Sequence, residues 1–157
     1  MLDGLRLEVL KRIPDERGCV MHGWKWRSGA KNNIVNEVYA TTIRQGVVKG
    51  WHLHKQAITR YIPVVGEVLI VLLDPRRNSS TNGEAWEVVL GERNYHRLEI
   101  PPGLWIGMKG LAEGESMLLN VTDYTHEPHE MLRLDPHAPV KLGPGIETDY
   151  AWRTRDR

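Results

Sequence analysis

The sequence contains no phenylalanine, a single cysteine and no apolar segment long enough to span a membrane. Cys19 alone cannot form an internal disulfide or a cysteine-based zinc site. The longest apolar run, from Val68 to Leu73, is far shorter than the roughly 20 residues of a transmembrane helix. Residues 1–18 carry scattered charges and lack the apolar core of a signal peptide. We therefore expect a cytoplasmic protein with no membrane partner.

The chain also lacks an excess of charge of either sign. Its 21 basic and 20 acidic residues give a formal net charge of +1, whereas a nucleic-acid-binding domain usually carries a strong basic excess. Hydrophobic residues make up 41% and charged residues 26%, near the averages of globular proteins. The 157 residues are enough for a single domain with one core. We expect residues 1–157 to form that domain, with no nucleic-acid partner.

Short apolar runs separated by turn residues predict an all-β sandwich or barrel. No segment in the first 125 residues has the pattern of a helix of ten residues or more. Three prolines and two glycines between Asp135 and Gly145 predict an extended C-terminal arm over residues 135–157. The predicted strands are Val20–Trp26, Val35–Ile43, Val47–Leu53, Arg60–Val65, Glu67–Leu73, Ala85–Leu90, Tyr95–Ile100, Leu104–Met108 and Ser116–Thr122.

The strongest candidate for chemistry is a pair of histidines at the end of the third of these strands. Alternation along a strand places His52 and His54 on one face. Two imidazoles directed into a barrel could bind a metal, serve as acid and base, or act as hydrogen-bonded structural residues. The preceding Gly50 favours a functional reading, because a glycine lets a ligand or backbone approach closely.

Six short signatures, in the right order, resemble the dTDP-4-dehydrorhamnose 3,5-epimerase family of cupins. The resemblance extends over roughly residues 15–130 and implies a cupin double-stranded β-helix, or jelly roll. Each signature alone is weak, but six with similar spacing are hard to obtain by chance. They are Asp15–Gly18, Gly46–His52, Val65–Val68, Asp74–Thr81, Ile100–Gly103 and Thr122–Tyr124.

The resemblance implies a nucleotide-diphosphate 4-keto-6-deoxy sugar as substrate and a reaction that needs no cofactor. His52 falls on the catalytic histidine of the family, which removes a proton beside the ketone. Arg60 stands where the family has a lysine that stabilises the enolate. Lys49 replaces an arginine, and Arg17 matches the arginine that grips the diphosphate across a dimer interface. This implies a homodimer in which residues 1–18 are exchanged. From the residues alone, solvated surface charges are the preferred interpretation of Lys49, Arg60 and Arg17.

Two positions depart from the epimerase pattern. Leu119 occupies the slot of the tyrosine that returns the proton from the opposite face, and Ile106 occupies a histidine slot. Tyr124, five residues after Leu119, would face the other side of a strand. We therefore expect proton exchange from one face only, with Tyr124 as a substrate contact.

Residues Lys49–Lys55 resemble instead a second cupin group, the dTDP-4-keto-6-deoxyhexose 3,4-ketoisomerases. A ketoisomerase can shuttle a proton on one face and does not require the missing tyrosine. His54 would take part in that shuttle, and Tyr39 lies at a spacing similar to that of the group's functional tyrosine. Trp51 and Trp105 flank the motifs and could stack on a base or sugar, or belong to the core.

Two other classes of function remain open. Metal-binding cupins add a glutamate shortly after the paired histidines and a third histidine after a later turn, but here those positions hold Ile58, Thr59 and Ile106. Two ligands make a poor transition-metal site, so we expect no metal. A metal-dependent cupin enzyme therefore stays an alternative reading. A non-catalytic cupin that binds a sugar nucleotide for regulation is the other.

Overall fold

The computed structural model describes residues 1–25, 34–125 and 127–152. These residues form strands, turns and loops without any helix, which confirms the all-β prediction. Within the described ranges there is accordingly no helix with the length and hydrophobicity of a membrane span. The end of the predicted strand Val20–Trp26 falls outside the described residues.

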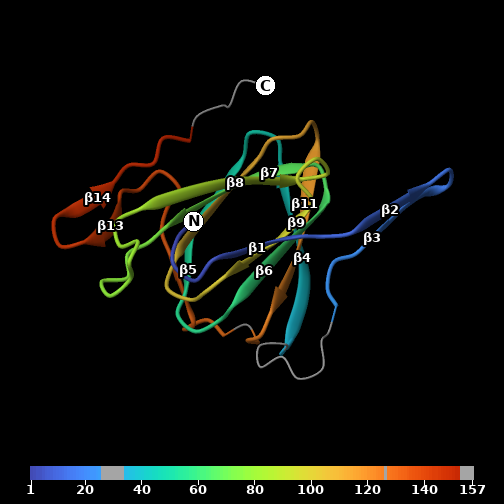
Figure 1. Cartoon of the computed structure of the whole chain (residues 1–157). Coiled ribbons are helices and arrows are strands. Elements are labelled where there is room, and N and C mark those ends of the chain that lie inside the picture. The colour runs from blue at the N-terminus through green and yellow to red at the C-terminus, as the bar shows by residue number, and fades with distance from the viewer. Residues whose placement is uncertain (26–33, 126, 153–157) are drawn as a thin grey trace.

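Two five-stranded antiparallel sheets face each other and form the body of the molecule (Figure 1). The first sheet has the order β1 (Arg6–Val9), β9 (His96–Ile100), β6 (Thr59–Val65), β11 (Glu115–Thr122) and β4 (Glu37–Arg44). The second has the order β12 (Met131–Arg133), β5 (Val48–His54), β10 (Trp105–Gly110), β7 (Glu67–Leu73) and β8 (Ala85–Gly91). Strands distant in sequence are thus neighbours, as in a jelly roll.

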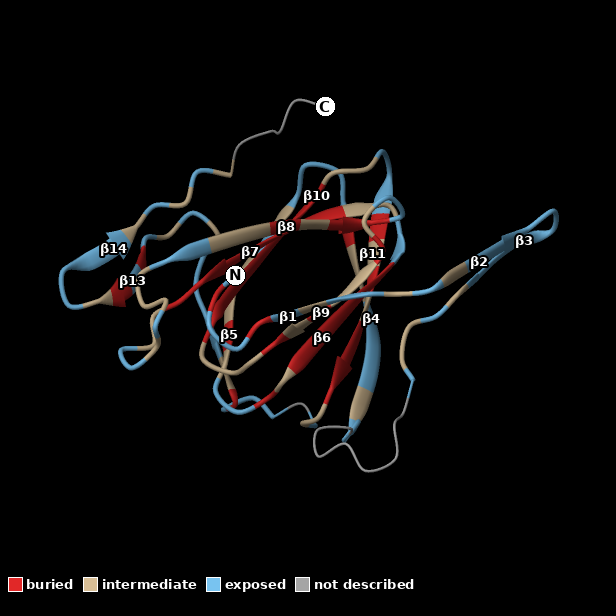
Figure 2. Cartoon of the chain, in the orientation of Figure 1, coloured by how far each residue is buried: buried red, intermediate tan, exposed pale blue. Residues whose placement is uncertain are grey.

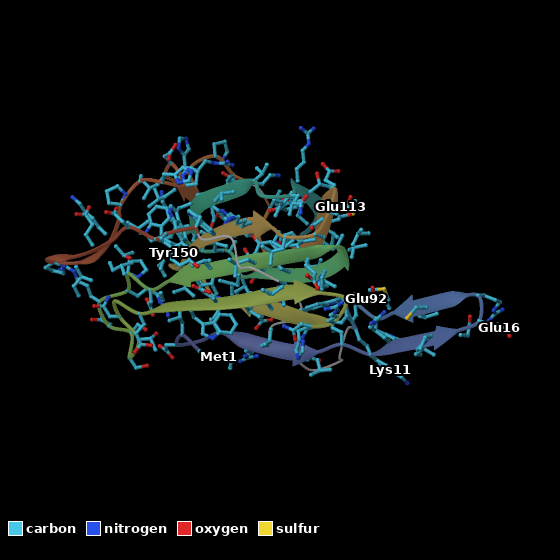
Figure 3. All side chains as sticks on the ribbon, turned by 90° about the horizontal axis from the view of Figure 1, so that it is seen from above. Met1, Lys11, Glu16, Glu92, Glu113 and Tyr150 are labelled. Atoms are coloured by element: carbon cyan, nitrogen blue, oxygen red, sulfur yellow. The ribbon has the colours of Figure 1, made fainter. Side chains whose placement is uncertain are left out.

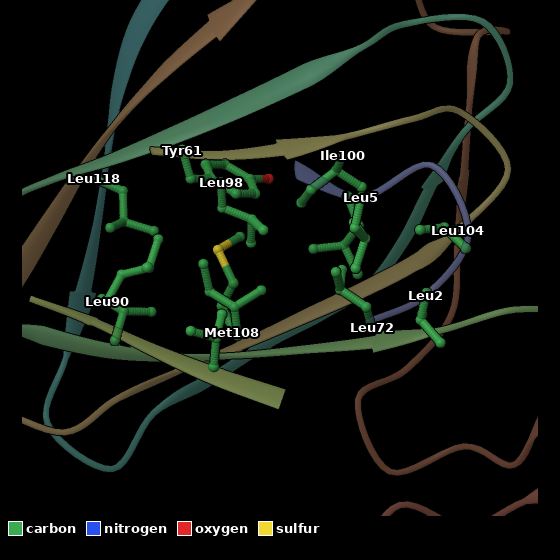
Figure 4. Packing of buried hydrophobic residues seen from close by; sticks show 14 of the residues in the cluster. Leu2, Leu5, Tyr61, Leu72, Leu90, Leu98, Ile100, Leu104, Met108 and Leu118 are labelled. Carbon is green, nitrogen blue, oxygen red and sulfur yellow. The ribbon is translucent and has the colours of Figure 1, made fainter. Parts of the chain in front are cut away.

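The main core fills the space between these sheets. Tyr61, Leu98 and Leu118 of the first sheet point toward Leu90 and Met108 of the second (Figure 4). Leu2 and Leu5 close one end of this core, so the N-terminal residues pack within their own chain.

Strand β7 is buried on both faces, as its continuous apolar sequence predicted. Val68, Ile70 and Leu72 join the main core, whereas the alternate residues join a second cluster on the outer face of the sheet. Those alternate residues are Leu69, Val71 and Leu73. Burial of each such side chain contributes about 1.5–3 kcal/mol, so the outer cluster stabilises the fold substantially.

The C-terminal arm covers this second cluster. Instead of staying extended, it forms the hairpin of β13 (Val140–Gly143) and β14 (Ile146–Thr148). Val140 and Leu142 are buried against the outer face of the second sheet, and Trp152 packs on Trp51 with ring centroids 5.1 Å apart. The apolar residues of the arm are therefore what makes both faces of β7 buried.

The N-terminal hairpin has the opposite character. Strands β2 (Arg12–Asp15) and β3 (Gly18–Met21) pair with each other and extend away from the barrel (Figure 1). Glu16 lies at its tip, remote from the barrel (Figure 3), and most of the hairpin is exposed (Figure 2). Behind it, the outer face of the first sheet carries a third apolar cluster that includes Ile62 and Val121.

The signature Asp74–Thr81 builds the loop between β7 and β8. The fully buried Asp74 carboxylate accepts hydrogen bonds from the guanidinium and backbone amide of Arg76 and from the hydroxyls of Ser79 and Thr81. Although burial alone would raise the pKa of Asp74, these hydrogen bonds hold it below its usual value. This signature is explained by loop structure, because none of its residues lines the pocket described next.

Candidate active site

A pocket with a volume of about 480 Å³ lies between the two sheets. The first sheet contributes Tyr39, Thr41, Tyr61 and Asn120 to its wall. The second sheet contributes Lys49, His52, His54 and Arg133. Apolar side chains, including Met108 and Met131, complete the wall. A partly apolar cavity with a few convergent polar groups is typical of a small-molecule site.

Strand alternation brings the two histidines together, as the sequence predicted. His52 and His54 both line the pocket, with ring centroids 5.6 Å apart and planes at 86°. The alternate residues of this strand, Trp51 and Leu53, point the other way and join the second cluster under the C-terminal arm. The short distance to the neighbouring backbone explains Gly50, because a Cβ there would lie 3.2 Å from the Cα of Gly107.

His54 is bound to a buried carboxylate that the sequence analysis did not identify. Its Nδ1 lies 2.7 Å from Oε2 of Glu130, just before β12. The other oxygen, Oε1, accepts hydrogen bonds of 3.0 Å from the backbone amides of Gln56 and Ala57. Burial would raise the pKa of Glu130, but these amides and His54 lower it, so the carboxylate is ionised at neutral pH.

His52 has a different environment. Its Nε2 lies 3.2 Å from the hydroxyl of Tyr61, a side chain only 2% exposed. Burial lowers the pKa of His52 to about 3, with smaller contributions from His54 and Arg133. Burial also raises the pKa of Tyr61, so that its hydroxyl stays protonated. The His52 and Tyr61 pair is therefore neutral at physiological pH.

Two further polar groups line the pocket on the first sheet. The amide of Asn120 donates a hydrogen bond to the hydroxyl of Tyr39. Burial raises the pKa of Tyr39 as well, which keeps this phenol protonated. The pocket thus holds two protonated tyrosines opposite two histidines. Tyr124 lines a small adjoining hollow together with Tyr39, His54 and Glu130.

Lys49 and Arg133 are the cations of the pocket among the described residues that line it. Lys49 donates a hydrogen bond of 3.4 Å to Thr41. Arg133 pairs with His52 across the β5–β12 ladder, which places their side chains on the same face. The sequence analysis did not single out Arg133, because the pairing of β12 with β5 joins segments almost eighty residues apart.

Arg60 does not lie in this pocket. It is fully buried on the other face of the first sheet, where its Nε donates a 2.7 Å hydrogen bond to Glu99. Its guanidinium stacks 4.9 Å above the ring of Trp24. Alternation along β6 directs the neighbouring Tyr61 to the pocket instead. The geometry gives no support to Arg60 as the group that stabilises an enolate.

Leu119 likewise lies outside the pocket. Its side chain packs against the third cluster on the outer face, whereas Asn120, the next residue, faces inward. Ile106 belongs to the main core. The absence of a tyrosine at position 119 therefore does not leave the pocket without a proton donor, because Tyr39 and Tyr61 reach it from other strands.

Of the remaining predicted contacts, Trp51 is among the residues that line the pocket, whereas Arg17 and Trp105 are not. Arg17 lies on the exposed hairpin turn, where it binds Asp15 at 2.7 Å. Trp51 and Trp105 are 1% and 8% exposed and both belong to the second cluster, which favours the core alternative although Trp51 also borders the pocket. In the described ranges, no group of three or more His, Cys, Asp or Glu side chains could hold a metal ion.

Comparison with known proteins gives a consistent result. A sequence model of dTDP-4-dehydrorhamnose 3,5-epimerase matches residues 1–155. The crystal structure of a dTDP sugar isomerase from Desulfovibrio desulfuricans is 31% identical, with a TM-score of 0.81, and the match covers 86% of this chain and 87% of that one. A sugar 3,4-ketoisomerase from Thermoanaerobacterium thermosaccharolyticum, in complex with TDP, is 25% identical with a TM-score of 0.66 over 85% and 90% of the two chains.

A curated relative matches over a smaller part of both chains. The "Probable low-salt glycan biosynthesis epimerase" of Haloferax volcanii is 30% identical over 102 residues. That match spans 62% of this chain and 65% of the relative, just under two thirds of its length. These similarities confirm the cupin fold expected from the sequence signatures.

Proposed function

The chain belongs to the dTDP-4-dehydrorhamnose 3,5-epimerase family, and from this premise we propose that it is an isomerase of sugar nucleotides. Its substrate is a nucleotide-diphosphate 4-keto-6-deoxy sugar, and it moves a proton on a carbon beside the ketone. One observation carries the proposal: two histidines, two protonated tyrosines and two cations from facing sheets line one pocket.

These groups suit the chemistry of a carbon acid. A proton on the carbon beside the ketone passes to a base, and the electron pair left behind delocalises onto the ketone oxygen as an enolate. Histidine, with an ordinary pKa near 6.5, is a suitable base at neutral pH. Return of a proton to the opposite face of that carbon inverts it. Delivery to the former carbonyl carbon, with exchange of the hydroxyl proton between the oxygens, moves the ketone.

The enolate oxygen requires a fixed positive or hydrogen-bonding group. Arg133 fits this role, because it lines the pocket opposite His52 on the adjacent strand. Lys49 then serves the diphosphate. Arg133→Met should lower the rate of proton exchange, and Lys49→Met should weaken nucleotide binding. Lys141→Met, an exposed site on β13, is the control and should change neither.

The two pocket tyrosines are the candidate proton donors. Tyr39 is the more exposed of the two, at 41%, and its hydroxyl lies beside Asn120. An epimerase would use it from the face opposite the histidine, whereas a ketoisomerase could dispense with it. The likeness of Lys49–Lys55 to the ketoisomerases favours a product in which the ketone has moved to the neighbouring carbon. Analysis of the product distinguishes this ketoisomer from an epimer.

We also propose that the protein is a homodimer joined through its N-terminal hairpin. Ile13 and Val20 on this hairpin are 43% and 60% exposed, and an isolated two-stranded hairpin is marginally stable in water. A second copy that covers the hairpin would bury these side chains. The same contact would carry Arg17 toward the pocket of the partner.

The proposal is tested in two steps. Addition of dTDP at ~100 times its dissociation constant should raise the free energy of unfolding by roughly 2.7 kcal/mol, measured as a thermal shift. In deuterated water, a dTDP-4-keto-6-deoxyhexose should then acquire deuterium beside the ketone. No thermal shift with any nucleotide diphosphate at millimolar concentration would overturn the sugar-nucleotide reading. Binding without exchange would favour the non-catalytic alternative.

A further inference from the structure

The two pocket histidines differ in the partner that fixes each ring. Glu130 binds His54 through Oε2, while both backbone donors at Gln56 and Ala57 converge on Oε1. The carboxylate therefore cannot rotate without losing these bonds. Its position is also held by the backbone, because Lys55 N donates to the carbonyl of Glu130 at 3.0 Å.

This arrangement selects one tautomer of His54. An ionised carboxylate can only accept hydrogen bonds, so the proton between the two groups belongs to Nδ1 of the imidazole. The lone pair of His54 then lies on Nε2, the ring nitrogen that remains for a molecule in the pocket. A carboxylate behind an imidazole also stabilises the imidazolium that forms when Nε2 takes up a proton.

In the described ranges, His52 has no such carboxylate partner. Its Nε2 is already engaged with Tyr61, and it carries the cation Arg133 as its cross-strand neighbour. A positive charge on His52 would therefore be opposed by Arg133, and no described acidic side chain lies close enough to support it. His52 is suited to a neutral hydrogen-bonding role.

We propose that His54, oriented by Glu130, is the base that removes the proton beside the ketone, and that His52 is a neutral hydrogen-bonding residue. The inference rests on the proposed function for the identity of the substrate. In the step, the C–H bond breaks, its proton passes to Nε2 of His54, and the electron pair moves to the ketone oxygen. The Nδ1 proton stays on the imidazole, so Glu130 is a positioning residue and not itself an acid.

The tautomer is tested without substrate. Two-dimensional ¹H–¹⁵N spectra of the histidine rings in the full-length protein should show His54 protonated at Nδ1. Glu130→Gln keeps the shape and can still accept from Gln56 and Ala57, but it presents an NH₂ group to His54. The proton of His54 should then move to Nε2. Glu127→Gln, an exposed carboxylate of the same loop, is the control and should leave the spectrum of His54 unchanged.

The catalytic assignment is tested by deuterium incorporation into a dTDP-4-keto-6-deoxyhexose. His54→Asn and Glu130→Gln should each lower kcat by ~10²–10⁴ with little change in KM, because a lost or wrongly protonated base affects the chemical step. The His52→Asn protein should incorporate deuterium into the substrate at least about tenfold faster than the His54→Asn protein. Thermal denaturation of each variant confirms that it is folded.

Two results would overturn the inference. The first is His54 protonated at Nε2 in the wild-type protein, which would remove the base regardless of substrate. The second is wild-type exchange that persists in His54→Asn and Glu130→Gln but disappears in His52→Asn. A wild-type protein that exchanges no substrate contradicts the proposed function instead, and the ¹⁵N spectra still decide the His54–Glu130 pairing.

Discussion

Replacement of Asp74 by asparagine should destabilise the protein strongly, although Asp74 is remote from the pocket. The carboxylate is fully buried and receives five hydrogen bonds, three of them from Arg76. An asparagine NH₂ group in place of Oδ2 cannot accept from Nη2 of Arg76. The hydroxyls of Ser79 and Thr81 can rotate to accept, but the guanidinium cannot.

The magnitude follows from the burial of this ion pair. Removal of one partner of a buried pair typically costs about 3–5 kcal/mol, because the other charge is left uncompensated. The side chain of Arg76 is 25% exposed, so water can solvate part of it and the lower end of the range applies. At about 2–4 °C per kcal/mol for a protein of this size, a loss of about 3 kcal/mol lowers Tm by about 6–12 °C.

The effect should also depend on pH. The folded-state pKa of Asp74 lies below its ordinary value of 3.8, so the unfolded chain binds the proton more readily. The stabilisation is therefore fully present above pH 3.8 and is lost as the pH falls through the lower folded-state value. The difference between wild type and Asp74→Asn should be constant near neutrality and shrink in acid.

Urea denaturation at several pH values measures both effects. Glu84→Gln, an exposed carboxylate at the other end of the same loop, is the matched control and should change stability by less than about 0.5 kcal/mol. An Asp74→Asn protein within about 1 kcal/mol of wild type would refute this account of the loop. So would a difference that stays the same down to the acid limit of folding.

Three further outcomes follow from other parts of the structure. Gly107→Ala should lower the free energy of unfolding by about 1–3 kcal/mol in urea denaturation, because its Cβ would lie 2.5 Å from the Trp152 ring. Light scattering should give twice 18.0 kDa for the wild type, and Val20→Asp should shift it toward the monomer; a wild-type monomer at micromolar concentration contradicts the hairpin interface. NMR should show His52 neutral down to pH 5, and stability should fall as the pH is lowered through 6.5, because the unfolded state takes up the proton first.

Much of the barrel could be predicted from local patterns. Eight of the predicted strands, from Val35–Ile43 to Ser116–Thr122, coincide within a residue or two with β4 to β11. The short strands β1, β2 and β12 to β14 were not predicted, because three or four residues carry too little periodic signal. Alternation also placed His52 and His54 on one face, which needs only the period of two.

The family resemblance did not identify which residues of β6 and β11 face the pocket. It pointed to Arg60 and to the tyrosine slot at Leu119, but Tyr61 and Asn120 line the pocket instead. In each case the outward residue is itself buried or half-buried, because the first sheet is covered by a third cluster on its outer face. A strand covered on both sides has no polar face to reveal its orientation.

The sequence by itself determined the class of fold, the shared face of the two histidines and the family, because these depend on short-range periodicity and on motifs within single segments. Only the tertiary structure decided which cations and phenols reach the pocket and which carboxylate orients His54. Glu130 lies 76 positions after His54 and reaches it because the following strand, β12, pairs with β5. Such a pairing depends on the packing of the whole barrel, so no local pattern around Glu130 could predict it.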